Sequence, residues 1–228
     1  DDLVYNDFFI GEGADVTIVA GCGVHSDGSE TARHNGIHRF FLEKGAKVLY
    51  KEKHIGTGKG TGLRRIDPVT DAYLKEDSYL DTVQLRGVDR TTRSTSAVLE
   101  KGAKIVVRER IMTDGDEDAV TKFKVELNGE DCGADVVSRS VARGNSHQAF
   151  YSVIEGNARC TGHSACDAIL ADNGRVDAQP ALNAANVDAA LIHEAAIGKI
   201  AGDQIMKLCS LGLTREEAEE KIIEGFLK

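Results

Sequence analysis

Almost the same fourteen residues occur twice in this chain, and this repetition limits the possible folds more than any other feature. LEKGAKVLYKEKHI at 42–55 returns as LEKGAKIVVRERIM at 99–112. Repetition at intervals of about 20 to 50 residues is typical of solenoids and arrays, in which each repeat buries one face against its neighbours. The sequence therefore predicts stacked structural units of similar shape.

The repeated pattern belongs to a longer series of turn-then-strand segments. Each segment opens with a Gly or Asp suited to a tight turn and continues as a short run rich in β-branched residues, which predicts a strand. The segments are EGADVTIV at 12–19, KGAKVLYK at 44–51, EDSYLDTV at 76–83, KGAKIVVR at 101–108 and CGADVVSR at 132–139, with turn residues Gly13, Gly45, Asp77, Gly102 and Gly133. We expect the near-identical pair to be equivalent strands of successive coils.

These segments predict a mainly β fold, a β-helix or a closely related coiled sheet. An ordinary β-sandwich whose hairpins share turn chemistry is the alternative. A helical solenoid is excluded because the strands alternate and apolar periodicity of about 3.6 residues is scarce before residue 195. The chain has no Trp and only 5% aromatic residues, so its core must consist of Val, Ile, Leu and Ala.

The pattern changes near residue 195. GDQIMKLCSLG predicts a helix ended by Gly212, and TREEAEEKIIEGFLK predicts a second helix that starts with Thr214 and Glu217 as a capping box. We therefore expect a β-helix core over residues 1–194 and a C-terminal helical region over residues 195–228. The apolar stripe of the last helix consists of Ala218, Ile222 and Phe226, supported by Ile223 and Leu227. This stripe must cover the open end of its own domain or dock onto a second protein.

Charge and composition exclude several classes of partner. The formal net charge is −9, with acidic and basic residues mixed along the chain, so we exclude nucleic acid and anionic membranes. No apolar run approaches the length of about 18 residues that a membrane helix needs, and no signal peptide is visible. The five cysteines are an odd number without disulfide-like spacing, which is typical of a reducing compartment. The expected location is the cytoplasm.

The glycine-rich stretch HIGTGKGTGLRR at 54–65 does not match a nucleotide-binding loop. A Walker motif needs Gly, four further residues, then Gly-Lys-Ser/Thr. Here Gly58-Lys59 is followed by Gly60, and Lys53 stands where the first Gly belongs. We expect this chain to bind no nucleotide.

Two short segments contain candidate ligands. Cys160, His163 and Cys166 lie within seven residues and are types that bind iron, zinc or an iron–sulfur cluster. On a regular strand, however, residues 160 and 166 share one face and His163 the other, so spacing alone favours buried thiols over a metal site. His193 and Glu194 form a charged pair inside an apolar run. Charged groups in such a run need ion-pair or hydrogen-bond partners, or have a functional role.

Residues 162–227 resemble the C-terminal core of the SufB/SufD family of iron–sulfur cluster assembly proteins. The matching segments are GHSACDAI at 162–169, HEAAIGKI at 193–200, DQIMKLCSLGL at 203–213 and EEAEEKIIEGF at 216–226. Upstream, GCG at 21–23 and HNGIHRFFLEKGAKV at 34–48 also resemble the family. The chain departs from the family in Ser164-Ala165, where an acidic residue usually precedes the cysteine, and in its shorter length.

The resemblance implies a right-handed parallel β-helix with a short C-terminal helical region. It also implies a complex with SufC, an ABC-type ATPase that docks on the helical region, here through Ile222, Ile223, Phe226 and Leu227. By the same analogy, Cys166 carries sulfur or ligates a transient iron–sulfur cluster. The family also places the positions of Glu194 and His193 close to that cysteine, across the interface between paired subunits. His163 and Cys160 are further metal-ligand candidates.

Two functions stay open at this point. The chain is either a SufB-like scaffold that holds a nascent cluster, or a SufD-like adaptor that couples the ATPase to a partner without ligating a cluster. In both cases we expect no enzymatic activity of its own. We also expect pairing through the β-helix, with a second copy or in a SufB/SufD-like heteropair.

Overall fold

Two parallel sheets and two terminal helices make up the fold. The computed structural model describes the backbone of residues 1–228 and every side chain except those of residues 83–87. Sheet A contains β1 (Asp2–Ile10), β3 (Ala32–Leu42), β5 (Arg64–Ile66), β6 (Val69–Leu74), β8 (Arg90–Leu99), β10 (Asp118–Leu127), β12 (His147–Gly156) and β14 (Arg175–Ala184). Sheet B contains β2 (Asp15–His25), β4 (Lys47–Thr57), β7 (Tyr79–Gly87), β9 (Lys104–Thr113), β11 (Gly133–Ala142), β13 (Thr161–Leu170) and β15 (Ala190–Gly198). The helices are α1 (Gly202–Cys209) and α2 (Arg215–Phe226).

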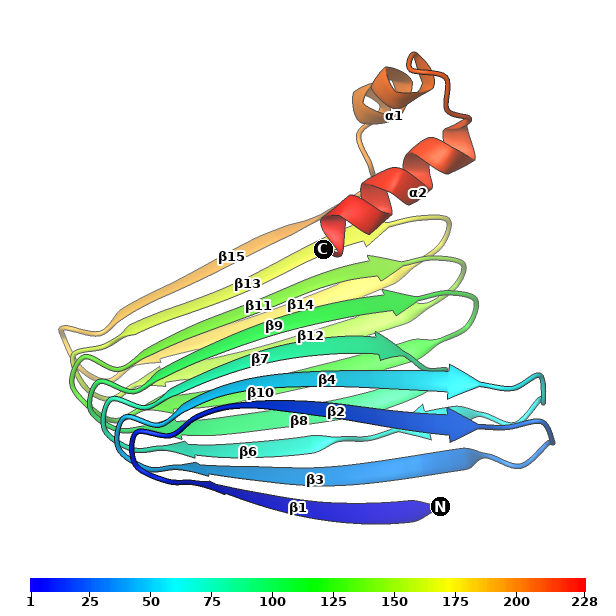
Figure 1. The fold of residues 1–228 in the computed structure, drawn as a ribbon. Helices are drawn as coiled ribbons and strands as arrows, with labels where there is room; N and C mark the ends of the chain where they lie inside the picture. The colour runs from blue at the N-terminus through cyan, green and yellow to red at the C-terminus, as the bar shows by residue number, and fades with distance from the viewer.

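The chain alternates between the two sheets and winds into a parallel β-solenoid of about seven turns (Figure 1). Each strand pairs in parallel with the strand one coil before and one coil after it, as in the ladder β9–β11–β13. The predicted mainly β, parallel β-helix class is confirmed, and the β-sandwich alternative is wrong because a sandwich would pair its strands antiparallel.

The predicted turn residues lie at the corner where the chain leaves sheet A. Gly13, Gly45 and Gly102 have φ angles of 65°, 65° and 69°, and Asp77 has 56°. Such left-handed backbone strains side chains with a Cβ, so Gly is favoured and Asp tolerated.

The sequence pattern predicts Gly133 at the same corner, and this prediction is wrong by two residues. Gly133 pairs with Lys104 inside the sheet, and Asp131, with φ 61°, occupies the turn instead. The sequence AD after Gly133 resembles the AK after Gly102 closely enough to suggest the wrong register.

The near-identical segments are equivalent strands, but they are not in successive coils. β4 and β9 carry them, and β7 lies between the two in sheet B. The divergent segment at 76–83 therefore fills the intermediate coil. Its backbone follows the same path because Asp77 replaces the corner glycine.

The interior of the solenoid changes from apolar to polar along β4 and β9 of sheet B. On β4, buried Val48 and Tyr50 are followed by buried Glu52 and His54. On β9, Val107 is followed by Glu109, which is fully buried. The apolar half forms one continuous core between the sheets, and the polar half contains ionised side chains that need partners.

The last coil and the helices differ from the predicted domain boundary. Residue 194 falls inside β15, so the strand region extends to Gly198. The two helices pack against each other at one side of the C-terminal end of the solenoid (Figure 1). They leave the inner face of the last coil open, since Ile197 on β15 stays 40% exposed. Among the described residues, no helix is long and apolar enough to cross a membrane.

Candidate functional site

Cys166 lies inside the solenoid, on β13. This strand is unbroken at Gly162, so its side chains alternate between the interior and the outer face as the spacing predicted. Ser164, two residues before Cys166, hydrogen-bonds across the interior to Ser152 of sheet A at 2.8 Å. Cys166 points the same way and is 1% exposed.

A small cavity lies between Cys166 and a buried carboxylate. Its lining includes Cys166, Ser138, Glu109 and Thr121, and its volume is about 10 Å³. A single water needs at least about this volume, whereas an iron–sulfur cluster needs far more. In this conformation the thiol therefore faces a space too small for a cluster.

The carboxylate of Glu109 accepts hydrogen bonds from both walls of this cavity. Thr121 of sheet A donates its hydroxyl at 3.0 Å, and Ser138 of sheet B donates at 2.9 Å. Glu109, Ser138 and Cys166 occupy one register position on β9, β11 and β13. The thiol and the carboxylate thus lie in the same inner row, with the serine between them.

Burial and two neighbouring carboxylates keep the Cys166 thiol protonated. Burial has the largest effect and, with the charges of Glu109 and Asp167, it raises the pKa of Cys166 to about 12. The thiolate is the nucleophile and the metal ligand, so a resting Cys166 is unreactive at neutral pH. A cation arriving at this site must displace the thiol proton.

His193 also faces the interior, on the last strand. It pairs in register with Ser164, so it is a diagonal neighbour of Cys166 in the adjacent coil. The His193 Nδ1 atom is buried and has no hydrogen-bond partner among the described residues. The structure therefore brings Cys166 and His193 to one face at the open end of the solenoid.

Glu194 and His163 lie on the opposite, outer face of sheet B. Glu194 pairs in register with Ala165, and its carboxylate lies 3.5 Å from Nε2 of His163. The other ring nitrogen of His163, Nδ1, lies 2.8 Å from Asp135. The thickness of the sheet thus separates this pair from Cys166 and His193 within one chain. No group of three or more His, Cys, Asp or Glu residues arranged to hold a metal occurs among the described side chains.

Cys160 stands apart from Cys166, at the corner before β13. Its thiol hydrogen-bonds to that of Cys132, which occupies the same corner one coil earlier. Both side chains are buried. Six residues of strand separate Cys160 from Cys166, or about 20 Å. The two cysteines do not form one site.

The predicted docking residues lie on α2 and are only partly covered. The capping box of Thr214 and Glu217 is formed as predicted. Ile223 is buried between the helices and the solenoid end, whereas Ile222, Phe226 and Leu227 remain half-buried. Some apolar surface of α2 is therefore left for a partner.

Sequence reasoning missed Glu109 and the buried ion pair of Glu52 with Arg93. A signal for both carboxylates was present in the repeat. Lys51-Glu52-Lys53 and Arg108-Glu109-Arg110 each place Glu between two cations on a strand. Because side chains alternate, outward cations require the central carboxylate to point inward.

Comparison with known proteins identifies the family. Residues 7–226 match the family model described as SUF system FeS cluster assembly, SufBD core domain. An iron–sulfur cluster assembly SufBD family protein of Archaeoglobus fulgidus is 29% identical over 228 residues, which cover 99% of this chain and 60% of that protein. A protein of the same description from Methanothermobacter thermautotrophicus is 29% identical over 221 residues, covering 95% of this chain and 53% of the relative.

The chain thus spans little more than half the length of these two relatives. The family match nevertheless covers the solenoid and both helices, and includes Cys166 and the His193-Glu194 pair. The chain belongs to the SufBD family of the SUF system for iron–sulfur cluster assembly.

Proposed function

We propose that this chain is the scaffold subunit of a SUF-type iron–sulfur cluster assembly complex and works with a SufC-like ABC-type ATPase. The observation that carries the proposal is the placement of Cys166 and His193 on one inner face at the open end of the solenoid. A thiol and an imidazole nitrogen without a partner are suitable ligands for iron. Two protein ligands bind a cluster incompletely, which suits a cluster that must be transferred.

The proton on Cys166 acts as a safeguard in this scheme. A thiol with a raised pKa does not react with oxidants or other thiols before iron arrives. Iron that reaches the cavity replaces the proton, and the nearby Glu109 carboxylate favours the approach of a cation. The chain orients these groups and excludes water, and we propose that it catalyses no reaction of its own and binds no nucleotide.

Anaerobic reconstitution tests the scaffold role. Wild type, Cys166→Ala, His193→Ala and the matched buried-thiol control Cys160→Ala are incubated with ferrous iron and sulfide. Bound iron and visible absorption are then recorded. We expect wild type and the control to hold iron with a charge-transfer band, Cys166→Ala to lose both, and His193→Ala to hold less. Equal iron in Cys166→Ala and wild type would refute the scaffold role of Cys166.

The adaptor function is the second candidate, and the size of the cavity favours it. A space of about 10 Å³ beside Cys166 holds no cluster unless the last coil moves. An adaptor binds the ATPase but holds no cysteine-dependent iron in the reconstitution, even with the ATPase and nucleotide present. The same experiment therefore separates the two functions.

Docking of the ATPase on the helices is tested separately. Ile222→Asp and Phe226→Asp place a charge on half-buried positions of α2, and Val187→Asp is the control at a fully exposed apolar residue in another turn. We expect the two α2 variants to lose complex formation with a SufC-like ATPase in size-exclusion chromatography. Complex formation by both folded variants would exclude this docking face.

We further propose that two subunits pair through the last coil, in a homodimer or with a SufD-like subunit. β14 and β15 are the final strands of their sheets, so each has a free backbone edge. Glu194 is 72% exposed there and would be available to a paired subunit. Sedimentation showing a concentration-independent monomer, alone and with the ATPase, would contradict this arrangement.

A further inference from the structure

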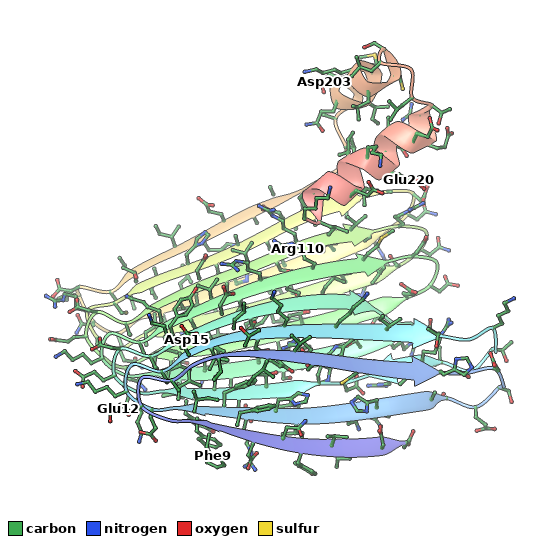
Figure 2. All side chains as sticks on the ribbon, viewed as in Figure 1. Phe9, Glu12, Asp15, Arg110, Asp203 and Glu220 are labelled. Atoms are coloured by element: carbon green, nitrogen blue, oxygen red, sulfur yellow. The ribbon has the colours of Figure 1, made fainter. Side chains whose placement is uncertain are left out.

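Three arginines gather on the outer face of sheet B, away from the candidate site inside the solenoid. Arg108 and Arg110 lie on β9, and Arg139 lies on β11 (Figure 2 labels Arg110). Arg110 and Arg139 are direct partners in the strand register. Neighbouring strands are about 4.8 Å apart, so two guanidinium groups leave the sheet side by side.

Acidic neighbours compensate these three charges unequally. Arg108 forms an ion pair with Asp81 at 2.9 Å. Arg139 has Asp167 at 4.0 Å, the outer limit of an ion pair. Arg110 has no carboxylate within that limit among the described side chains. It donates from Nη1 to the backbone oxygen of Glu109 at 2.9 Å, and its Nε is buried without an acceptor.

This arrangement is unfavourable for the isolated chain. Like charges directly opposite on neighbouring strands destabilise a sheet. Burial lowers the pKa of Arg110, and the charges of Arg139 and Arg108 lower it further. A bound anion would remove the repulsion and supply the missing acceptor.

We propose that Arg110 and Arg139 form an oxyanion-binding site on the outer face of sheet B, which takes a phosphate or carboxylate group. The planar guanidinium group binds two oxygens of a carboxylate or phosphate with two parallel hydrogen bonds, and adjacent arginines can hold one group between them. Arg108, paired with Asp81, lies at the next outward position on β9, and Asp167 competes for Arg139. The site does not depend on Cys166 or on the proposed cluster.

Thermal unfolding with and without phosphate tests the site. Wild type, Arg110→Gln and Arg139→Gln are heated at one ionic strength in chloride or inorganic phosphate, followed by circular dichroism. Arg175→Gln, on exposed β14, is the control with the same change of charge. Phosphate stabilises many proteins without binding a site, and the response of the two variants measures that background.

We expect phosphate to raise the Tm of wild type and of Arg175→Gln more than that of either site variant. In chloride, Arg110→Gln should unfold no earlier than wild type because the repulsion is gone. A second arm titrates a hexaglutamate peptide at low salt by calorimetry. Loss of one arginine should weaken its binding about tenfold, a change expected for a charge-assisted contact.

The two arms identify the source of the oxyanion. A response to phosphate alone assigns a free phosphate group, and a response to the peptide alone assigns carboxylates of a partner protein. If neither ligand distinguishes wild type from Arg110→Gln, the oxyanion site does not exist.

Discussion

Replacing Arg93 by Met is expected to destabilise the solenoid by removing the partner of a buried carboxylate. Arg93 is fully buried and its Nη1 is hydrogen-bonded to Glu52, which is 2% exposed. Its Nε and Nη2 donate to Thr95 at 3.0 Å and to Thr70 at 3.2 Å. Met fills a similar volume without charge or donors, so the substitution tests the electrostatics of the interior more than its packing.

The magnitude follows from what remains around Glu52. Breaking a buried ion pair by removing one partner costs about 3 to 5 kcal/mol. Tyr50 still donates to Glu52 at 3.0 Å, and Nε2 of His54 lies 3.2 Å from the carboxylate. These contacts place the expected loss near the lower limit, ~3 kcal/mol, a large part of the 5–15 kcal/mol typical of a whole domain.

The loss should depend on pH in a defined direction. Burial opposes ionisation of Glu52, but the charge of Arg93 and the hydrogen bond with His54 hold its pKa well below the ordinary value. In wild type this ionised pair stabilises the fold above the unfolded pKa and weakens only as pH falls through the folded pKa. Without Arg93, burial dominates and raises the pKa of Glu52. Protonation of Glu52 as pH falls therefore removes the buried charge and reduces the destabilisation of the variant. The difference in unfolding free energy between wild type and the variant should therefore become smaller as pH is lowered from 7 to 5.

Urea unfolding followed by far-UV circular dichroism measures this loss at both pH values. Glu52→Gln in the Arg93→Met background removes the uncompensated charge, so the double variant should be more stable than Arg93→Met alone. A loss below about 1 kcal/mol at pH 7, or a double variant as unstable as the sum of the single variants, would refute the reasoning.

Three further predictions concern the outer face, a corner and the helices. The hydrogen bond to Asp177 raises the pKa of His147; burial opposes this shift, and the hydrogen bond to Asp118 adds to it. The contacts of protonated His147 with these carboxylates should therefore stabilise the fold fully below about pH 6.5, and this stabilisation should be lost as pH rises through the folded pKa. Proton NMR of His147 should show the raised pKa, and an Asp177→Asn variant with an unchanged value would contradict it. Gly129→Ala should destabilise the protein more than Gly45→Ala in urea unfolding. A Cβ at Gly129 would lie 1.9 Å from the backbone nitrogen of Lys101, which is a steric clash. At Gly45 a Cβ meets no atom, so only the positive φ disfavours alanine there, at a cost of about 1 to 2 kcal/mol. Thr214→Ala removes the N-cap hydrogen bond of α2 and should lower the local stability of this helix by ~1 kcal/mol. Hydrogen exchange should then show faster exchange of the α2 amides. Unchanged exchange would show that packing alone stabilises the helix.

Much of the fold could be predicted because its determinants are local. The corner residues Gly13, Gly45, Asp77 and Gly102 carry the left-handed backbone that their sequence context indicated. Alternation correctly separated His163 from Cys166. The error at Gly133 arose because the corner before β11 contains one residue more than the corner before β9, and no local pattern shows which residues then face each other.

The candidate site could be predicted only in part, because it depends on contacts between distant segments. Sequence reasoning grouped Cys166 with Glu194, yet alternation along β15 places Glu194 outside and His193 inside. Glu109 shares the cavity with Cys166 through the registers of β9, β11 and β13 and through Thr121 on the facing sheet. The only sequence signal for this contact across two sheets is a weak one, a Glu between two cationic residues.

The free edge of β15 has a mechanical consequence. β15 is bonded along one side only, to β13, and it covers the coil that holds Cys166. Residues 199–201 alone connect it to α1, so tension on the helices is transmitted directly to this strand. Hydrogen bonds that are loaded one after another from a strand end break at far lower force than bonds loaded all together. Pulling on α1 would therefore unzip β15 first, beginning at Gly198, while the coils behind it stay closed.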